Sequence, residues 1–256
     1  MKVQLVQAID ESTALSKDRW FTPLNLISLS TYLENYGYGV EILDGLHLHL
    51  DDLLKRIDGN IVGINFNIFS TQTMDKISEY AKNQDSLVVV GGQAATPLAK
   101  QLLLGNKNID LVVRYDGEET LRQVVNRVRT GSNDFKGIPN ITYRRGREIV
   151  EGEVQRLDLQ TLPIPNRKVK GISLEDYILS FKSSPLFGDF TSGRRPTNVH
   201  TMRGCNRSCS FCGRIFKGIR SRTPEQVFEE DKKLIEEFEV NYIYETSDTY
   251  FTDINW

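Results

Sequence analysis

The sequence is poor in cysteine and histidine, with three of each among 256 residues. All three cysteines, Cys205, Cys209 and Cys212, fall within eight residues of one another. An odd number of cysteines in a chain without a secretory leader argues against a framework of disulfide bonds. Random placement seldom brings three cysteines so close together, so their grouping calls for a chemical reason.

The sequence also lacks a long hydrophobic run and an excess of one charge. No stretch approaches the ~18 apolar residues that a transmembrane helix needs, and the first residues, MKVQLVQAIDES, contain no small-residue cleavage site. Basic and acidic residues number 32 and 34, interspersed along the chain, whereas a nucleic-acid partner would favour a basic face. We therefore expect a cytoplasmic protein that has a hydrophobic core, no membrane span and no nucleic-acid partner.

Short apolar runs alternate with helical patterns over residues 1–135. The expected strands lie in residues 2–8, 40–45, 60–68, 86–92 and 109–114, and the expected helices in 23–38, 50–58, 73–84, 96–105 and 117–131. The strands are rich in Val, Ile and Leu with little alternation, as expected when both faces of a strand are buried. This order predicts an α/β domain, a doubly wound parallel sheet of the Rossmann-like type with helices on both faces.

Glycine and polar residues follow several of these strands. In an open α/β sheet, ligands bind at the carboxyl ends of the strands, and glycine lets backbone approach a large ligand closely. The alternative is that such residues simply end the strands, as they do in any α/β protein. The candidate ligand-binding residues at these ends are Asp44, Asn65, Ser70, Gly91, Gly92, Gly117 and Glu118.

Residues 136–195 are interpreted as a hairpin followed by a linker. Residues 137–153 predict a β-hairpin with Arg145 and Gly146 at the turn, and two prolines at 163 and 165 indicate the linker. Residues 196–256 predict one further β-α-β unit. Its helix begins at Thr223 and Pro224, a good N-cap followed by proline in the first turn. The cysteines lie in the loop between its first strand and its helix.

The cysteine spacing is Cys205-x3-Cys209-x2-Cys212. Thiolates bind soft metals and iron–sulfur clusters, and three ligands on a four-iron cluster leave one iron open to chelate a small molecule. A zinc site is the nearest alternative, with a water or His200 as the fourth ligand. Three buried cysteines without a metal are the remaining alternative.

The segment from Arg203 to Cys212 resembles the cysteine loop of the radical S-adenosylmethionine (SAM) superfamily. The likeness lies in the cysteine spacing, in Arg203 and Gly204 before the first cysteine, and in Phe211 before the third. The resemblance implies a [4Fe–4S] cluster on the three cysteines, with SAM chelating the fourth iron and being cleaved reductively to a 5′-deoxyadenosyl radical.

The same resemblance suggests residues that bind SAM. Phe211 would flank the adenine of SAM, with packing of the loop as its alternative. Residues 241–253 are similar to the second barrel strand and its acidic turn. There Glu245 would bind the SAM amino group, although the family's two glycines are absent. Asp248 either faces the site or is a solvated turn residue.

Upstream, the chain resembles the subgroup with an N-terminal cobalamin-binding domain. Residues 88–92, 109–114, 116–120 and 162–165 follow the order of that domain and its linker. The resemblance implies either cobalamin at the strand ends named above or a domain that has kept its fold and lost the cofactor. The Asp-x-His-x-x-Gly signature that places a histidine on cobalt is missing, because His47 is offset and lacks the following glycine. We expect His47 and His49 to be surface residues.

The resemblance as a whole implies the N-terminal portion of an enzyme for radical methylation, cyclisation or related chemistry. Its partners would be a small-molecule substrate and an electron donor. Residues 196–256 contain only two strands and one helix of an incomplete radical SAM barrel, which suggests a fragment, a truncated product or a chain completed by a second one. The alternatives are a non-catalytic corrinoid-binding module or split-enzyme subunit, and a zinc-stabilised structural protein.

Overall fold

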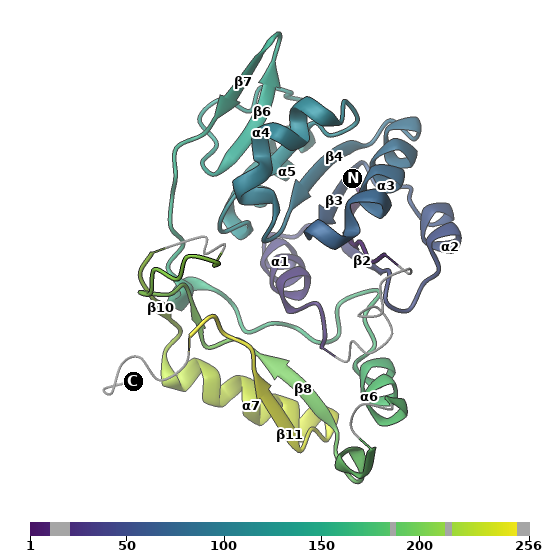
Figure 1. The fold of residues 1–256 in the computed structure, drawn as a ribbon, viewed down its shortest axis with the longest axis vertical. Helices are drawn as coiled ribbons and strands as arrows, with labels where there is room; N and C mark the ends of the chain where they lie inside the picture. The colour runs from purple at the N-terminus through teal and green to yellow at the C-terminus, as the bar shows by residue number, and fades with distance from the viewer. Residues whose placement is uncertain (11–20, 185–187, 213–216, 250–256) are drawn as a thin grey trace.

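A seven-stranded sheet forms the larger part of the computed structural model, which describes residues 1–10, 21–184, 188–212 and 217–249 (Figure 1). The strand order is β2-β1-β3-β4-β5-β6-β7. The first five in this order are parallel: β1 (Val3–Gln7), β2 (Val40–Asp44), β3 (Ile61–Asn65), β4 (Leu87–Gly91) and β5 (Leu111–Val113). The order reverses direction between β1 and β3, and such a switch point is where ligands bind in doubly wound sheets.

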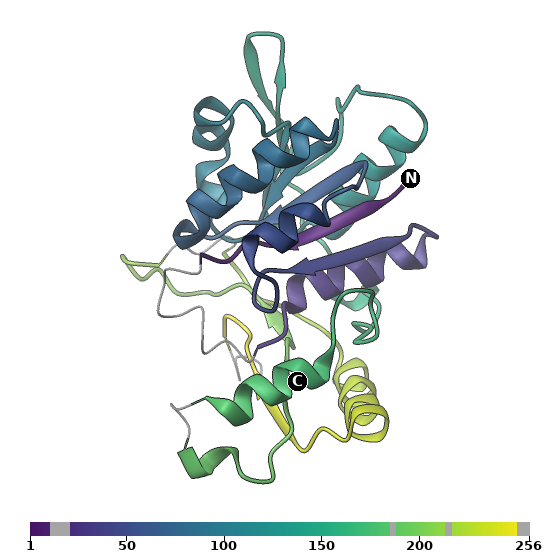
Figure 2. The same ribbon diagram turned by 90° about the vertical axis from the view of Figure 1, so that its right-hand side faces the viewer.

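Helices cover both faces of this sheet (Figure 2). On one face pack α1 (Leu24–Asn35) and α5 (Glu118–Arg129), and on the other α2 (Leu50–Lys55), α3 (Thr71–Asn83) and α4 (Ala95–Gly105). Along β4, the side chain of Val89 packs in the hydrophobic core under α1 and α5, whereas those of Val88 and Val90 pack in the core under α2, α3 and α4. Both faces of the strand are therefore apolar, which confirms the predicted doubly wound α/β fold.

The predicted hairpin is confirmed, and it belongs to the sheet. It consists of β6 (Ile141–Arg145) and β7 (Glu148–Glu151), with Gly146 at a φ of 62° in the turn. β6 pairs antiparallel with β5, with Val113 opposite Ile141. The sheet thus continues beyond residue 135 to Glu151.

After the hairpin, where the sequence showed little pattern, the described residues form two short 3₁₀ helices and one α-helix. These are η3 (Leu159–Thr161), α6 (Leu174–Ser183) and η4 (Gly188–Thr191). Ser173 caps α6, because its side chain accepts a hydrogen bond from the backbone N–H of Asp176. Buried Ile178 on α6 packs with Val199 and Leu234, so this helix supports the C-terminal part of the chain.

The C-terminal part is the predicted β-α-β unit. Strands β8 (Pro196–Val199) and β11 (Tyr242–Glu245) pair in parallel, and α7 (Pro224–Phe238) connects them. Thr223 and Gln226 form a capping box at the start of α7. Two short strands, β9 (Met202–Arg203) and β10 (Arg220–Ser221), pair antiparallel and close the loop that carries the cysteines. Residues 250–253 of the predicted acidic turn lie outside the described residues.

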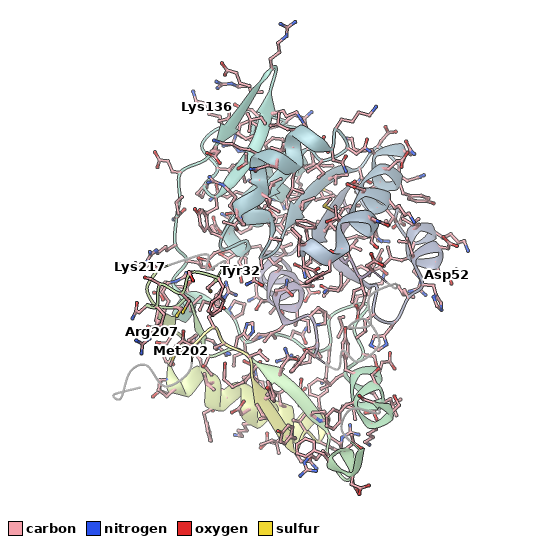
Figure 3. The ribbon with its side chains drawn as sticks, viewed as in Figure 1. Tyr32, Asp52, Lys136, Met202, Arg207 and Lys217 are labelled. Carbon is pink, nitrogen blue, oxygen red and sulfur yellow. The ribbon has the colours of Figure 1, made fainter. Side chains whose placement is uncertain are left out.

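Figure 3 places this loop on the molecule. Arg207 and Lys217, both in the loop, lie on the side of the molecule opposite Asp52 of α2. Among the residues that the structure describes, no helix has the length and hydropathy to cross a membrane.

Candidate functional site

A cavity of about 550 Å³ lies at the carboxyl edge of the sheet and extends to the cysteine loop. Leu24 and Leu29 of α1 contribute apolar surface, and Leu162 and Pro163 bring in the linker. The sheet side includes Asn65, Gly91, Gly92, Tyr115, Gly117 and Glu118, and the C-terminal side includes His200, Met202, Arg203, Cys205, Cys212 and Asp248. One space is therefore shared by the two regions that the sequence singled out.

Close packing requires a glycine at position 92, just after β4. Gly92 has a φ of 107°, and a Cβ there would lie 2.5 Å from the Asn65 side-chain oxygen and 2.6 Å from the Phe66 carbonyl oxygen. Only glycine fits this position without strain. At Gly91 a Cβ would meet nothing closer than 3.8 Å, so its backbone stands open toward the cavity.

Two of the predicted ligand-binding residues serve local structure instead of lining this cavity. The Asp44 carboxylate accepts hydrogen bonds from the Tyr177 hydroxyl and from the backbone N–H of Leu46. Burial, together with the charge of Asp44, raises the pKa of Tyr177 above its usual value. Ser70 exchanges hydrogen bonds with the backbone of Asn67 at the turn that precedes α3. Asp44 thus attaches α6 to the sheet, and Ser70 stabilises a turn.

The cysteine loop presents its thiols on an accessible surface. Cys205 is half-buried, and Cys209 and Cys212 are exposed. Cys205 and Cys212 line the cavity, and the Cys205 sulfur accepts a hydrogen bond of 3.3 Å from the backbone N–H of Arg207. Within the described ranges, no three His, Cys, Asp or Glu side chains are gathered as a metal site. Three accessible thiols in one loop nevertheless are the donors that an iron–sulfur cluster takes.

The predicted SAM-binding residues lie at the edge of this arrangement. Phe211 is 91% exposed and does not line the cavity. The Glu245 carboxylate accepts hydrogen bonds from the backbone N–H groups of Ser247, at 2.8 Å, and Thr201, at 3.4 Å. The acid of this turn that lines the cavity is Asp248, which accepts a hydrogen bond of 2.8 Å from the backbone N–H of Gly204.

The serine of the same turn holds the strand that leads to the cysteines. The Ser247 hydroxyl lies 2.9 Å from the backbone nitrogens of both Thr201 and Met202 and accepts from both. Two residues further along, the Thr249 hydroxyl donates a hydrogen bond of 3.0 Å to the Gly204 carbonyl. The turn after β11 therefore fixes the backbone of residues 201–204.

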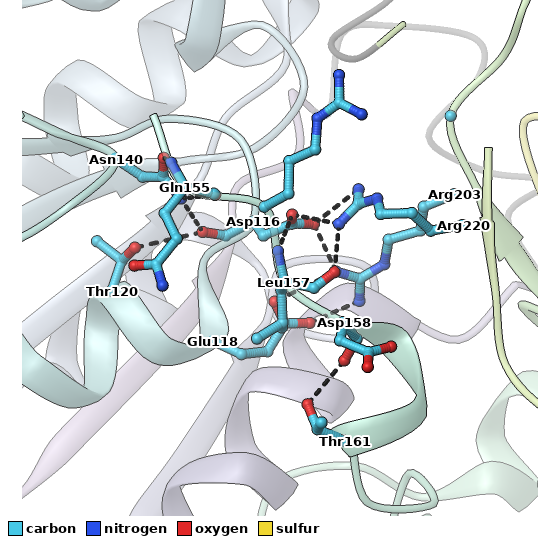
Figure 4. A network of polar contacts seen from close by, with 12 residues as sticks. Asp116, Glu118, Thr120, Asn140, Gln155, Leu157, Asp158, Thr161, Arg203 and Arg220 are labelled. Atoms are coloured by element: carbon cyan, nitrogen blue, oxygen red, sulfur yellow. Dashed lines mark hydrogen bonds and ion pairs between the residues drawn. The ribbon is translucent and has the colours of Figure 1, made fainter. Parts of the chain in front are cut away.

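A buried cluster of charges joins the sheet to the base of the cysteine loop (Figure 4). Asp116 contacts both Arg203, at 3.1 Å, and Arg220, at 2.6 Å. Glu118 contacts Arg203 at 2.5 and 3.2 Å through its two oxygens. Burial opposes the charge of Arg203, but Glu118 and Asp116 outweigh it and raise the pKa of this guanidinium above its usual value. Sequence reasoning placed Glu118 at a ligand-binding edge and gave no role to Asp116.

A second buried cluster joins the linker to the β-α-β unit. Arg167 donates to Glu230 at 2.8 Å, and Glu230 also accepts from Arg222. Arg167 donates further to the Thr22 hydroxyl and to the Asn198 carbonyl. Burial lowers the pKa of Arg167 even though the charge of Glu230 opposes this. No sequence motif indicated this cluster.

His200 is a half-buried residue of the cavity wall. Burial, with the positive charge of Arg203, lowers the pKa of His200, so the imidazole is neutral at pH 7. In the zinc alternative this histidine or a water would be the fourth ligand, and His200 does line the same cavity as Cys205 and Cys212.

Comparisons with known proteins agree with the fold. Residues 20–125 match the family model described as the B12 binding domain. An uncharacterized methyltransferase of Pyrococcus horikoshii is 27% identical over 240 residues, which cover 89% of this chain and 49% of that protein. The chain thus spans about half the length of this relative.

Two solved structures share the fold over nearly the whole chain. One is the radical SAM methyltransferase TsrM of Kitasatospora setae, solved with tryptophan and a SAM analogue (TM-score 0.73, 21% identity, 99% of this chain and 49% of that one). The other is the cobalamin-dependent radical SAM enzyme OxsB with aqua-cobalamin bound (TM-score 0.76, 18% identity, 97% and 34%). The predicted likeness to radical SAM enzymes with a B12-binding domain is confirmed.

Proposed function

We propose that this chain, which has a B12-binding domain and the fold of cobalamin-dependent radical SAM enzymes, supplies the two cofactor sites of such an enzyme. One observation carries the proposal: a single cavity is lined both by the sheet edge at Asn65, Gly91 and Gly92 and by Cys205 and Cys212. A corrinoid at that edge and a cluster on that loop would face the same space.

The sheet edge offers a corrinoid open backbone and apolar surface. The backbone of Gly91 is open toward the cavity, the turn at Gly92 is restricted to glycine, and α1 contributes apolar side chains. Cobalamin, when bound, supplies a methyl carrier or a redox partner for a radical. His47 is exposed and packs edge-on against Tyr177, with ring centroids 4.7 Å apart. His47 therefore packs against α6. We propose that cobalt is held without a histidine of the Asp-x-His-x-x-Gly type.

The cysteine loop fits a [4Fe–4S] cluster by its donor set. Cys205, Cys209 and Cys212 would hold it, and such a cluster supplies the electron that cleaves SAM. Both acids of the turn accept backbone N–H groups, but only Asp248 of the two lines the cavity. We therefore propose Asp248, in place of Glu245, as the acid that would bind the amino group of SAM.

Two of the similar proteins favour methyl transfer as the reaction. Both the Pyrococcus protein and TsrM are described as methyltransferases, so we propose that the complete enzyme methylates a small molecule and receives electrons from a separate donor.

A corrinoid-binding module without a cluster is the second candidate. It is favoured by one observation, that the three cysteines are not gathered as a metal site within the described ranges.

Anaerobic reconstitution of the full chain with iron and sulfide separates these candidates. The proposal predicts about four irons per chain, as a cubane cluster requires, and a broad absorption shoulder. The variant Cys205→Ala is expected to lose both, and Ser208→Ala in the same loop to keep both. Equal iron in wild type and Cys205→Ala would overturn the cluster. A colourless protein with one zinc per chain would favour the zinc-stabilised alternative.

A further inference from the structure

The base of the cysteine loop is held by carboxylates of the sheet domain. Arg203 and Arg220 are register partners in the β9–β10 ribbon, so they stand side by side at the two ends of the loop that carries the cysteines. Both guanidinium groups contact Asp116, and Arg203 also contacts Glu118 (Figure 4). Both ends of the loop are therefore attached at one point of the sheet edge.

The backbone around Asp116 is shaped for this contact. Tyr115 adopts a φ of 60°, an uncommon conformation for a bulky residue, and its N–H is held by the Thr96 hydroxyl at 2.9 Å. This turn brings Asp116 out of β5, and Gly117 then caps α5, so that Glu118 lies in its first turn. A carboxylate in that position is also favoured by the helix dipole.

The linker is fixed at the same point. The backbone N–H of Leu157 donates to Asp116 at 3.1 Å, and the Leu157 carbonyl accepts from Arg220 at 2.6 Å. Asp116 and Glu118 are 6% and 3% exposed, and their partners Arg220 and Arg203 are 16% and 25% exposed. Pairs whose carboxylates are buried in this way are less open to water than surface pairs and keep a defined geometry better.

We propose that Asp116 and Glu118 are positioning residues, which set the cysteine loop at a fixed place over the carboxyl edge of the sheet. This inference rests on the proposed function only in the statement that the loop holds a cluster. The position of the loop itself follows from the contacts, and it defines the separation between the thiols and the corrinoid edge. Neither residue binds cofactor in this role.

A distance measurement by pulsed electron paramagnetic resonance tests this without iron or corrinoid. One spin label is attached to Cys209, which is exposed, in the full chain with Cys205→Ser and Cys212→Ser. The second is attached at Leu104→Cys, because Leu104 is 77% exposed at the end of α4. We expect a narrow distance distribution with the acids intact. Asp116→Asn and Glu118→Gln are expected to shift and widen it.

Glu119→Gln is the matched control. Glu119 is the next residue of α5, and it also pairs with an arginine, but its partners Arg122 and Tyr32 lie within the sheet domain. An unchanged distribution in both Asp116→Asn and Glu118→Gln would overturn the proposal, as would an equal change in Glu119→Gln. If Asp116→Asn does not fold by circular dichroism, Glu118→Gln decides alone, because it leaves the Asp116 contacts in place. Since no metal is present, failure of the proposed function would leave this result readable.

Discussion

Removing the charge of Glu230 is expected to destabilise the C-terminal part of the chain strongly. This carboxylate lies between Arg167 and Arg222, and the three side chains are 2%, 2% and 8% exposed, in the order Glu230, Arg167, Arg222. In Glu230→Gln the two guanidinium groups lose their counter-charge while they remain buried. Breaking a buried pair in this way costs about 3–5 kcal/mol, a large part of the ~5–15 kcal/mol that stabilises a typical domain.

The assay is urea unfolding followed by circular dichroism, with limited proteolysis to locate the region that opens. The control is Glu237→Gln, on the same helix α7. Glu237 pairs with Lys168, the residue next to Arg167, but these two side chains are 43% and 63% exposed. Such a surface pair contributes about 0–1 kcal/mol. Similar losses of unfolding free energy in Glu230→Gln and Glu237→Gln would refute the reasoning.

Three other single-residue changes have expected outcomes. Gly92→Ala is expected to cost about 1–3 kcal/mol of unfolding free energy and to weaken retention of hydroxocobalamin in gel filtration, because its Cβ would meet Asn65 and Phe66; Gly105→Ala, where a Cβ meets nothing within 4 Å, should change neither. Tyr177→Phe removes the hydroxyl that donates to buried Asp44 and should lower the unfolding free energy by about 1–3 kcal/mol; a loss near zero in urea unfolding would contradict this contact. The pKa of His200 is lowered from 6.5 in the folded chain, so below about pH 6.5 the unfolded chain binds a proton that the folded chain does not, and the unfolding free energy should decline as the pH falls. His200→Gln should reduce the pH dependence of the urea midpoint, measured at a series of pH values. An unchanged pH dependence in this variant would contradict the lowered pKa.

The sequence predicted the sheet because its strands are buried on both faces, which leaves uninterrupted apolar runs such as residues 88–90. It did not predict α6, whose buried face depends on contacts with β8 and with Asp44 that only the fold creates. Local pattern cannot show a helix that is stabilised mainly by such distant partners.

The sequence predicted several residues of the candidate site, but it did not predict the ion pairs that hold the site together. The cysteine spacing is local and was readable, and Asn65, Gly91 and Gly92 do line the cavity with Cys205. The role of Asp116 was not readable, because its partners Arg203 and Arg220 are 87 and 104 positions away. Such distant pairs depend on how the β9–β10 ribbon lies against the seven-stranded sheet, and that arrangement leaves no periodic signal in the sequence.

If one cavity holds both cofactors, the electron spin relaxation of cob(II)alamin will depend on the cluster. The full chain is loaded with hydroxocobalamin, iron and sulfide, then reduced. A paramagnetic cluster across the cavity would speed the relaxation of the cobalt signal, so we expect faster relaxation in wild type than in Cys205→Ala loaded in the same way. Equal relaxation rates, with both cofactors bound to wild type, would contradict a shared cavity.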